Sequence, residues 1–255
     1  MNGEPRRIHV IPMGLELDRI IGGLKEYPTN RVILLNGRDP STEIERMSRK
    51  NGQRIREMVR ATMDIEEIEL DIFDFYKAAR QLRKLFQDLA DEGWSVHVNL
   101  STGNRIVSSA ALLASFMTGA TPYYVRPERY SIPEDQEVLS YGVEEVIRIP
   151  SVRIMGPDVK QETVLRVLGG MGGSARHETS LIAPLDEVKN FFTERKEGES
   201  KRAHLARKRA FLSRTLRNME REGYISLQKR GRFVNVVLSE TGALFSGQVA
   251  DAGNF

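Results

Sequence analysis

A strand pattern that ends in a polar turn and continues directly into a helix pattern, at residues 95–119, constrains the fold of this chain most. Val96, Val98 and Leu100 alternate with polar residues, and this period of two predicts a β-strand with one apolar face. The small and apolar residues that follow the turn predict a helix. A strand that leads through a turn into a helix is the building unit of parallel α/β sheets.

Strand and helix patterns alternate through the rest of residues 1–150. Further strands are predicted at residues 6–13, 31–37, 66–73, 121–125 and 143–149, with helices among them at 15–24, 42–63 and 75–92. Because this alternation is typical of βαβ units, we predict an α/β domain with a doubly wound, mostly parallel, Rossmann-like sheet. Ligands of such sheets bind beyond the carboxyl ends of the strands, where the strand order reverses.

Three predicted strand ends therefore carry the candidate ligand-binding residues. The turn at 101–105 offers hydroxyl groups, a glycine and a cation at the start of a helix, where unpaired N–H groups favour an anion. A simple helix cap by Ser101 or Thr102, with a solvated Arg105, would explain this turn as well. The complete set is Met13, Gly14, Leu15, Glu16, Asn36, Gly37, Ser101, Thr102, Gly103, Asn104 and Arg105.

Several classes of function are disfavoured. None of the predicted strand ends contains G-x-G-x-x-G or G-x-x-x-x-G-K-[ST], which argues against a dinucleotide cofactor and nucleoside triphosphate hydrolysis. The absence of cysteine excludes thiol chemistry, and the four histidines lack metal-ligand spacing. We predict no catalytic residue, metal or cofactor. No apolar run is long enough to span a membrane and no signal peptide is recognisable, so we expect a cytoplasmic protein without a membrane partner.

The charge is distributed unequally along the chain. Residues 1–150 contain 20 Lys and Arg against 23 Asp and Glu, whereas residues 151–255 contain 18 against 12. An excess of positive charge in one half favours a polyanionic partner for that half. Pro150 and Pro157 bound a break in the strand and helix patterns, so we predict a linker at residues 151–157.

The segment at residues 203–222 has the clearest pattern of the basic half. Leu205, Leu212, Leu216 and Met219 recur at helical spacing, so we expect a helix with these side chains in the core and arginines on the opposite face. Two shorter helices are predicted before it, at 158–168 and 184–195. Two strands joined by a basic turn are predicted after it, at 224–228 and 233–238.

This order of elements resembles that of winged helix-turn-helix transcription factors. Because arginine side chains bind phosphates and guanine edges well, we predict that residues 158–255 bind double-stranded DNA. A winged helix that binds another protein is the alternative. The predicted DNA-binding residues are Arg207, Lys208, Ser213, Arg214, Arg217, Arg221, Lys229, Arg230 and Arg232.

The sequence Asn-Leu-Ser-Thr-Gly-Asn-Arg at residues 99–105 resembles the strand-four motif of CARF domains, the CRISPR-associated Rossmann folds. Thr102 stands where the family often has glycine, and Arg105 where lysine is common. The resemblance implies that residues 1–150 bind a cyclic oligoadenylate, such as cyclic tetra-adenylate, across the two-fold axis of a homodimer. A CARF domain followed by a winged helix is the arrangement of CARF-type transcription regulators, which implies a nucleotide-responsive regulator of transcription.

Two alternatives remain open at the sequence level. Some CARF domains cleave the bound ring without metal, and Ser101 and Arg105 could stabilise the developing charge in such a ring nuclease. No general base is evident in the sequence, which argues against this reading. A regulator that senses another metabolite through the same turn is the second alternative.

Overall fold

The structure, a computed structural model, describes residues 6–39, 41–59, 62–130, 140–150, 156–231 and 233–246. The chain divides into two compact units, Met1–Met155 and Gly156–Phe255, and each is described by itself. The boundary between the units falls within the predicted linker 151–157. Residues 151–155 of that linker lie outside the described part of the chain.

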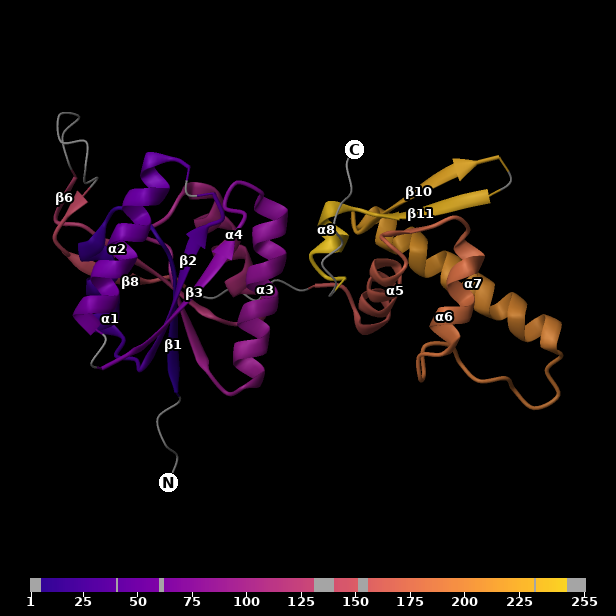
Figure 1. Cartoon of the computed structure of the whole chain (residues 1–255). Coiled ribbons are helices and arrows are strands. Elements are labelled where there is room, and N and C mark those ends of the chain that lie inside the picture. Colours follow the sequence, from indigo (N-terminus) through magenta and orange to yellow (C-terminus); the bar gives the residue numbers. More distant parts are fainter. Residues whose placement is uncertain are drawn as a thin grey trace, which may run out of the picture. The chain divides into compact units, whose positions relative to one another are not determined.

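The first unit is built on a six-stranded sheet with the order β3-β2-β1-β4-β5-β8 (Figure 1). Its strands are β1 (Arg7–Pro12), β2 (Arg31–Gly37), β3 (Asp64–Leu70), β4 (Ser95–Asn99), β5 (Thr121–Arg126) and β8 (Glu145–Arg148). Strands β1 to β5 run parallel, which confirms the predicted mostly parallel α/β sheet. In contrast, β8 runs antiparallel to β5. Between β5 and β8 the described residues form only a two-stranded ribbon, β6 (Arg129–Tyr130) with β7 (Ser140–Tyr141).

Four helices cover the sheet. They are α1 (Leu17–Glu26), α2 (Glu43–Val59), α3 (Phe75–Asp91) and α4 (Arg105–Thr118). Figure 1 shows α1 and α2 on one face of the sheet and α3 and α4 on the other. Strands covered on both faces must be apolar throughout, which explains the continuous apolar run from Val32 to Leu35 in β2.

The strand order reverses between β1 and β4. From β1 the chain proceeds through β2 to β3 on one side, and α3 then carries it back to β4 on the other side of β1. The crevice of a doubly wound sheet lies at such a reversal, beyond the carboxyl ends of the strands. The residues that follow β1 and β4 are therefore the first place to look for a ligand site.

Two histidines lie within the sheet. The Nε2 of His9 donates to the carbonyl of Tyr27 at 2.8 Å, so its Nδ1, 2.9 Å from the Tyr123 hydroxyl, accepts from that hydroxyl. The His9 ring stacks on that of His97 with centroids 5.6 Å apart. Burial lowers the pKa of His9 to about 4 and also lowers the pKa of His97. Both rings thus belong to the core, and neither reaches the crevice.

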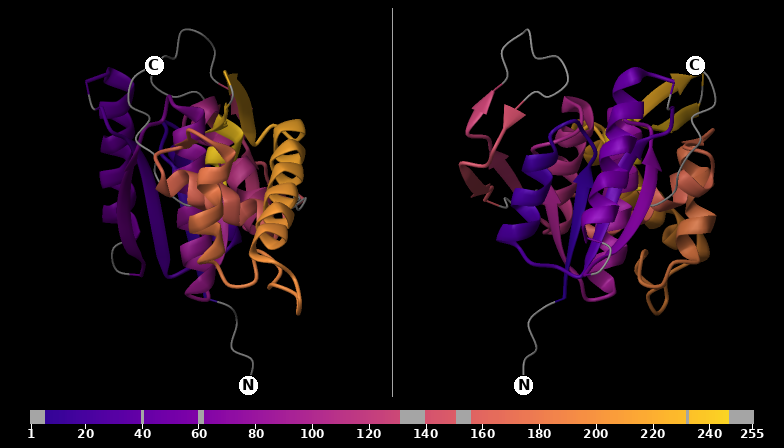
Figure 2. Two further views of the ribbon diagram at one scale, coloured as in Figure 1. Left: turned by 90° about the vertical axis from the view of Figure 1, so that its right-hand side faces the viewer. Right: turned by 60° about the vertical axis from the view of Figure 1, so that its left-hand side comes forward.

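The second unit contains short helices, one long helix and a three-stranded sheet with the order β10-β11-β9. Its elements are α5 (Val159–Gly170), β9 (Ser174–Ala175), the 3-10 helix η1 (Glu178–Leu181), α6 (Ile182–Asp186), α7 (Lys201–Arg221), β10 (Ile225–Arg230), β11 (Phe233–Leu238) and α8 (Glu240–Ala243). The long helix is α7, drawn in orange at the right of the left view in Figure 2. A capping box of Asp158 and Gln161 begins α5, which confirms the helix predicted from residue 158.

The helix predicted at residues 184–195 is wrong. The chain is helical only up to Asp186, and Asn190 has a φ of 62°, in the left-handed region that interrupts a right-handed helix. The pattern misled because Leu185 and Phe191 are both buried, although they reach the core from different segments. Leu205 was also expected in the core, yet it is 39% exposed, because only the second half of α7 packs inward.

Candidate functional site

The residues that follow β1 and β4 lie against each other. We call Met13–Glu16 the β1 loop and Ser101–Arg105 the β4–α4 turn. The Thr102 hydroxyl donates to the carbonyl of Pro12 at 2.6 Å. A Cβ atom added to Gly14 would lie only 2.6 Å from the backbone nitrogen of Gly103. The structure therefore brings together two segments that the sequence placed at separate strand ends, and their contact requires glycine at position 14.

The hydroxyl groups of the β4–α4 turn hold the turn itself. Ser101 Oγ accepts from the backbone N–H of Val125 at 2.5 Å, and the backbone N–H of Ser101 donates to Asn99 Oδ1 at 2.8 Å. Ser101 and Thr102 are both buried. Since a serine hydroxyl that accepts one hydrogen bond keeps its proton to donate, Ser101 retains one donor. Thr102 has used its donor on Pro12.

The start of α4 presents the polar groups that face outward. Asn104 Oδ1 accepts from the N–H of Val107 at 2.8 Å, which caps the helix, and its Nδ2 donates to the carbonyl of Ile72 at 3.0 Å. The amides of Arg105 and Ile106 have no hydrogen-bond partner in the described part of the chain. The Arg105 side chain is exposed. The helix is thus capped by Asn104 and not by Ser101 or Thr102, while two amides and a guanidinium remain for an anion.

Asn36 and Gly37 lie at the end of β2, and their hydrogen bonds go to β3 and α2. Asn36 Nδ2 lies 3.2 Å from Glu67 Oε2 on β3. The N–H of Gly37 donates to Glu45 Oε2 at 3.2 Å, and its carbonyl accepts from Arg49 at 2.7 Å, so α2 covers this glycine. Among the described residues neither of them contacts the β4–α4 turn through a hydrogen bond.

The sequence analysis missed a residue of α2 that supports the β1 loop. Asn51 Nδ2 lies 3.3 Å from the carbonyl oxygen of Gly14 and 3.1 Å from that of Leu15, and the residue is buried. An asparagine in a helix interior is unfavourable by propensity, and this was the available signal. A pocket of about 460 Å³ adjoins this contact. Its lining includes Leu15, Lys50, Asn51, Arg54, Ser140 and Tyr141.

The predicted DNA-binding residues of α7 divide into two groups. Arg214, Arg217 and Arg221 are exposed and have no carboxylate partner among the described residues. Ser213 is partly buried. Arg214 and Arg221 reach only neighbours on the same helix, the carbonyl of Ala210 and Asn218 Oδ1 respectively. Three cations on one exposed helix face form a basic surface that could meet phosphates.

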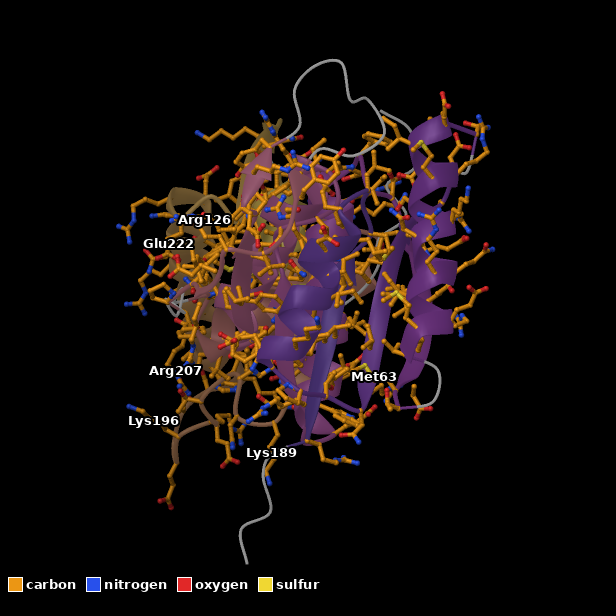
Figure 3. The ribbon with its side chains drawn as sticks, turned by 90° about the vertical axis from the view of Figure 1, so that its left-hand side faces the viewer. Met63, Arg126, Lys189, Lys196, Arg207 and Glu222 are labelled. Atoms are coloured by element: carbon orange, nitrogen blue, oxygen red, sulfur yellow. The ribbon has the colours of Figure 1, made fainter. Side chains whose placement is uncertain are left out.

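Arg207 and Lys208 instead contact the protein itself. Arg207 pairs with Glu199 at 2.8 Å, and Figure 3 shows it near the loop that carries Lys196. Lys208 pairs with Asp186 and lies over the ring of Phe192, 5.4 Å from its centroid. Lys229 is exposed at the end of β10. The side chain of Arg230 and all of Arg232 lie outside the described residues.

Within the ranges that the structure describes, no group of three or more His, Asp or Glu side chains is placed to hold a metal ion. In the same ranges, none of the helices is both long and apolar enough to cross a membrane.

The sheet order defines the first unit as a mostly parallel, Rossmann-like α/β domain, and an anion-compatible turn lies at its strand-order reversal. A family model described as "HFX_2341_N:-like, N-terminal" matches residues 7–130, just under half of the chain. No curated protein matches the sequence.

Three solved structures share a distant likeness with the chain. The structure of Can2 from Sulfobacillus thermosulfidooxidans in complex with cyclic tetra-adenylate is 14% identical with a TM-score of 0.40, and the match covers 91% of this chain and 73% of that one. Enterococcus italicus Csm6 bound to cyclic hexa-2'-fluoro-hexa-dAMP is 11% identical with a TM-score of 0.44, covering 87% and 56%. Protein VC1899 from Vibrio cholerae is 16% identical with a TM-score of 0.37, covering 94% and 64%. The chain thus spans less than two thirds of the latter two proteins.

Proposed function

We propose that this protein is a homodimeric transcription regulator that binds DNA through its second unit and a cyclic oligoadenylate through its first. The observation that carries the proposal is the contact between the β1 loop and the β4–α4 turn at the strand-order reversal. There, the amides of Arg105 and Ile106 and the Arg105 guanidinium remain for an anionic ligand.

The chemistry of the turn favours a phosphate group. Amides at the start of a helix and a guanidinium both donate hydrogen bonds, and the helix dipole adds a positive potential at the same place. The resemblance of residues 99–105 to the CARF motif narrows the anion to the phosphates of a cyclic oligoadenylate. A ring with two-fold symmetry can be shared by two identical crevices, which is why we propose a homodimer.

The second unit supports the DNA-binding half of the proposal. Its elements follow the order helix, strand, helix, helix, strand, strand, and β10 pairs with β11 in an antiparallel hairpin. This is the order of a winged helix, in which the third helix reads DNA and the hairpin follows the backbone. The exposed Arg214, Arg217 and Arg221 lie on the helix that would take this role.

Calorimetry tests the ligand. Cyclic tetra-adenylate is titrated into the full chain and into the Arg105→Ala variant. We expect the wild type to bind the ring. The binding free energy of the variant should be weaker by roughly 1.5–3 kcal/mol, the contribution of a charge-assisted hydrogen bond. Lys84→Ala on α3, where Lys84 pairs with Asp88 at 2.7 Å, is the control for removing a cation. Absence of binding to the wild type with any cyclic oligoadenylate near millimolar concentration would refute the sensor assignment.

The same sample tests the ring-nuclease alternative. After incubation with cyclic tetra-adenylate without metal, the nucleotide is separated by chromatography. Recovery of the intact ring supports a sensor. Linear products that disappear in the Ser101→Ala variant would instead show that the turn cleaves the ring, because Ser101 retains the hydroxyl proton in this turn.

A further inference from the structure

Arg19, in the first turn of α1, is a buried cation that has no anionic partner among the residues that the structure describes. Its side chain is only 5% exposed. Its Nε donates to the carbonyl of Val125 at 2.9 Å, and its guanidinium carbon lies 4.7 Å from the centroid of the Tyr124 ring. Its Nη2 is buried, and in the described part of the chain it has no hydrogen-bond partner. No ion pair joins Arg19 to a carboxylate there either.

The position of Arg19 follows from the unequal lengths of β4 and β5. The N–H of Leu100 donates to the carbonyl of Tyr123, so Tyr123 presents its backbone groups to β4. By the two-residue period of a strand, Val125 presents its backbone groups to the same side, where β4 has already ended. Ser101 Oγ accepts a hydrogen bond from the N–H of Val125, and Arg19 Nε donates one to the Val125 carbonyl. Arg19 and Ser101 thus replace the missing strand at the carboxyl edge of the sheet, next to the crevice.

The surroundings do not balance this charge. A cation in the first turn of a helix is unfavourable because the helix dipole is positive there. The Tyr124 ring offsets only a part of the cost of burying a guanidinium. The nearest acidic residue in sequence, Asp18, accepts from the N–H of Gly142 at 2.9 Å instead. An unpaired buried charge is costly enough that it usually marks a place where a counter-ion binds.

The ring over Arg19 is that of Tyr124, which lies on β5 of the main sheet. The hydroxyls of Tyr124 and Tyr130 are 3.5 Å apart. Tyr130 is 65% exposed and lies on β6, which pairs with β7 and not with the main sheet.

We propose that Arg19 is the buried anion-binding residue of the crevice, and that its Nη2 and the hydroxyl proton of Ser101 bind one phosphate oxygen of the ligand. The identity of the ligand rests on the proposed function, whereas the anion site does not. Hydrogen bonds to the backbone of Val125 hold both side chains. Arg19 Nε donates to the Val125 carbonyl, and Ser101 Oγ accepts from the Val125 N–H. The pair is therefore held in place before the ligand arrives, which reduces the entropy lost on binding.

The matched variant is Arg19→Gln. The Nε2 of glutamine is separated from Cα by the same number of bonds as the Nε of arginine, so the donor to the Val125 carbonyl is kept, while Nη2 and the charge are lost. The control is Arg129→Gln, which also removes an arginine that lies over a tyrosine, 4.6 Å from the Tyr141 centroid, but at an exposed position. Circular dichroism verifies the fold of both variants.

The first measurement is calorimetry with cyclic tetra-adenylate on the full chain. We expect Arg19→Gln to bind at least about tenfold more weakly than wild type, as for loss of a charged hydrogen bond, and Arg129→Gln to bind as wild type does. Equal affinity of wild type and Arg19→Gln would overturn the proposal. If the wild type does not bind this ring, the proposed function fails and the second measurement decides on the anion site.

The second measurement is thermal unfolding in sodium phosphate and in sodium chloride at equal ionic strength. Phosphate should raise the Tm of the wild type and of Arg129→Gln more than that of Arg19→Gln, since an anion that binds only the folded state stabilises it. In chloride, Arg19→Gln should be at least as stable as wild type, because an unbalanced buried charge is removed. An equal phosphate response in all three proteins, or a large loss of Tm in chloride for Arg19→Gln alone, would show that Arg19 serves the fold only.

Discussion

Arg207 of α7 holds Glu199 of the preceding loop in a two-point ion pair, with Nε 3.1 Å from Oε1 and Nη2 2.8 Å from Oε2. The same guanidinium donates to the carbonyl of Glu194 at 2.9 Å. The hydrogen bond from Arg207 lowers the pKa of Glu199 to about 2, because it favours the charged carboxylate. Arg207 therefore fastens the loop before α7 to the helix, a role separate from any contact with DNA.

The first prediction concerns this ion pair. Glu199→Gln should loosen the loop and speed trypsin cleavage after Lys196, whose N–H donates to Glu199 Oε2 at 3.0 Å. Glu197→Gln is the matched control, since it removes an exposed carboxylate from the same loop. Cleavage is followed by mass spectrometry. Identical rates for the two variants would contradict a fastening role for Glu199.

The ion pair also sets a pH dependence. The pKa of Glu199 is lowered in the folded state, so its stabilising contribution is present above pH 4.5, the ordinary value, and is lost as the pH falls toward 2. Trypsin cannot be used there, so hydrogen exchange of the loop amides at several pH values is the measurement. Wild type should approach the exchange of Glu199→Gln only in that acidic range.

The second prediction concerns the exposed arginines of α7. Replacing Arg214 and Arg217 together with alanine should weaken binding of operator DNA by a few kcal/mol, because both side chains are exposed for phosphate or base contacts. Arg166→Ala, an exposed arginine on α5, is the control. Fluorescence anisotropy at fixed salt gives the affinities. If the double variant and Arg166→Ala bind DNA alike, α7 does not read DNA.

Lys229 should act differently from the helix arginines. It lies exposed at the end of β10, where a wing would follow the phosphate backbone. Lys229→Ala should therefore weaken binding uniformly across sequences and lower the salt dependence of the affinity by about one phosphate equivalent. A change in sequence preference instead would place this lysine at a base edge.

The third prediction tests the contact that builds the crevice. Gly14→Ala should disrupt the β1 loop, because the added Cβ would lie 2.6 Å from the Gly103 nitrogen and 2.9 Å from Glu16 Oε2. Gly52→Ala on α2 is the matched control, since its Cβ would meet nothing closer than 3.7 Å and alanine favours a helix by roughly 1 kcal/mol. We expect Gly14→Ala to lose ligand binding and Gly52→Ala to keep it, both measured by calorimetry. Retained affinity in Gly14→Ala would show that the loop does not form the site.

Much of the fold could be predicted because its signal is local. Parallel strands covered on both faces require continuous apolar runs such as Val32 to Leu35, and these are visible without any structure. The direction of β8 could not be predicted in this way, since a short strand has the same pattern in either direction. The prediction of a helix at 184–195 was wrong because two buried residues, Leu185 and Phe191, lie in different segments although their spacing resembles that of one helical face.

The location of the candidate site could be predicted from the sequence, whereas the hydrogen bonds within it could not. The strand ends at Met13 and Ser101 follow from topology, and the structure brings them together. The hydrogen bonds of these hydroxyls depend on the neighbouring strands. Ser101 Oγ accepts from the N–H of Val125 because β5 is longer than β4, and it keeps its proton, whereas Thr102 donates its proton to Pro12. Asn51 contacts the β1 loop from α2, and Arg19 contacts the Val125 carbonyl from α1. Neither residue lies in a motif, so no local pattern marks them.

The fourth prediction concerns acid stability. The folded-state pKa of His9 is about 4 against 6.5 when free, so the unfolded chain takes up the proton first as the pH falls. The contribution of neutral His9 is complete above pH 6.5 and is lost progressively toward pH 4, up to roughly 3 kcal/mol at about 1.4 kcal/mol per unit. In urea unfolding, His9→Gln should be less stable at neutral pH yet lose less stability between pH 7 and 5. His204→Gln is the control. An unchanged pH slope in His9→Gln would contradict the account.

The last prediction is that nucleotide and DNA binding are coupled. The two units are joined through residues 151–157. We expect so short a connection to limit the independent motion of the units, so that binding at one unit affects binding at the other. In a dimer, a ligand shared by the two first units would change the spacing of the paired α7 helices. DNA half-sites lie about 34 Å apart, so a changed spacing costs phosphate contacts on both sides.

We expect a coupling of roughly 1–3 kcal/mol, and by linkage DNA must alter the affinity for nucleotide by the same factor. Operator DNA is titrated with and without saturating cyclic tetra-adenylate, and the reverse titration checks the reciprocity. The experiment is repeated after residues 151–156 are replaced by a longer Gly/Ser linker, which should abolish most of the coupling while leaving each affinity intact. If nucleotide shifts the DNA affinity of both proteins equally, the signal does not pass through this connection, because a flexible linker cannot transmit a fixed spacing.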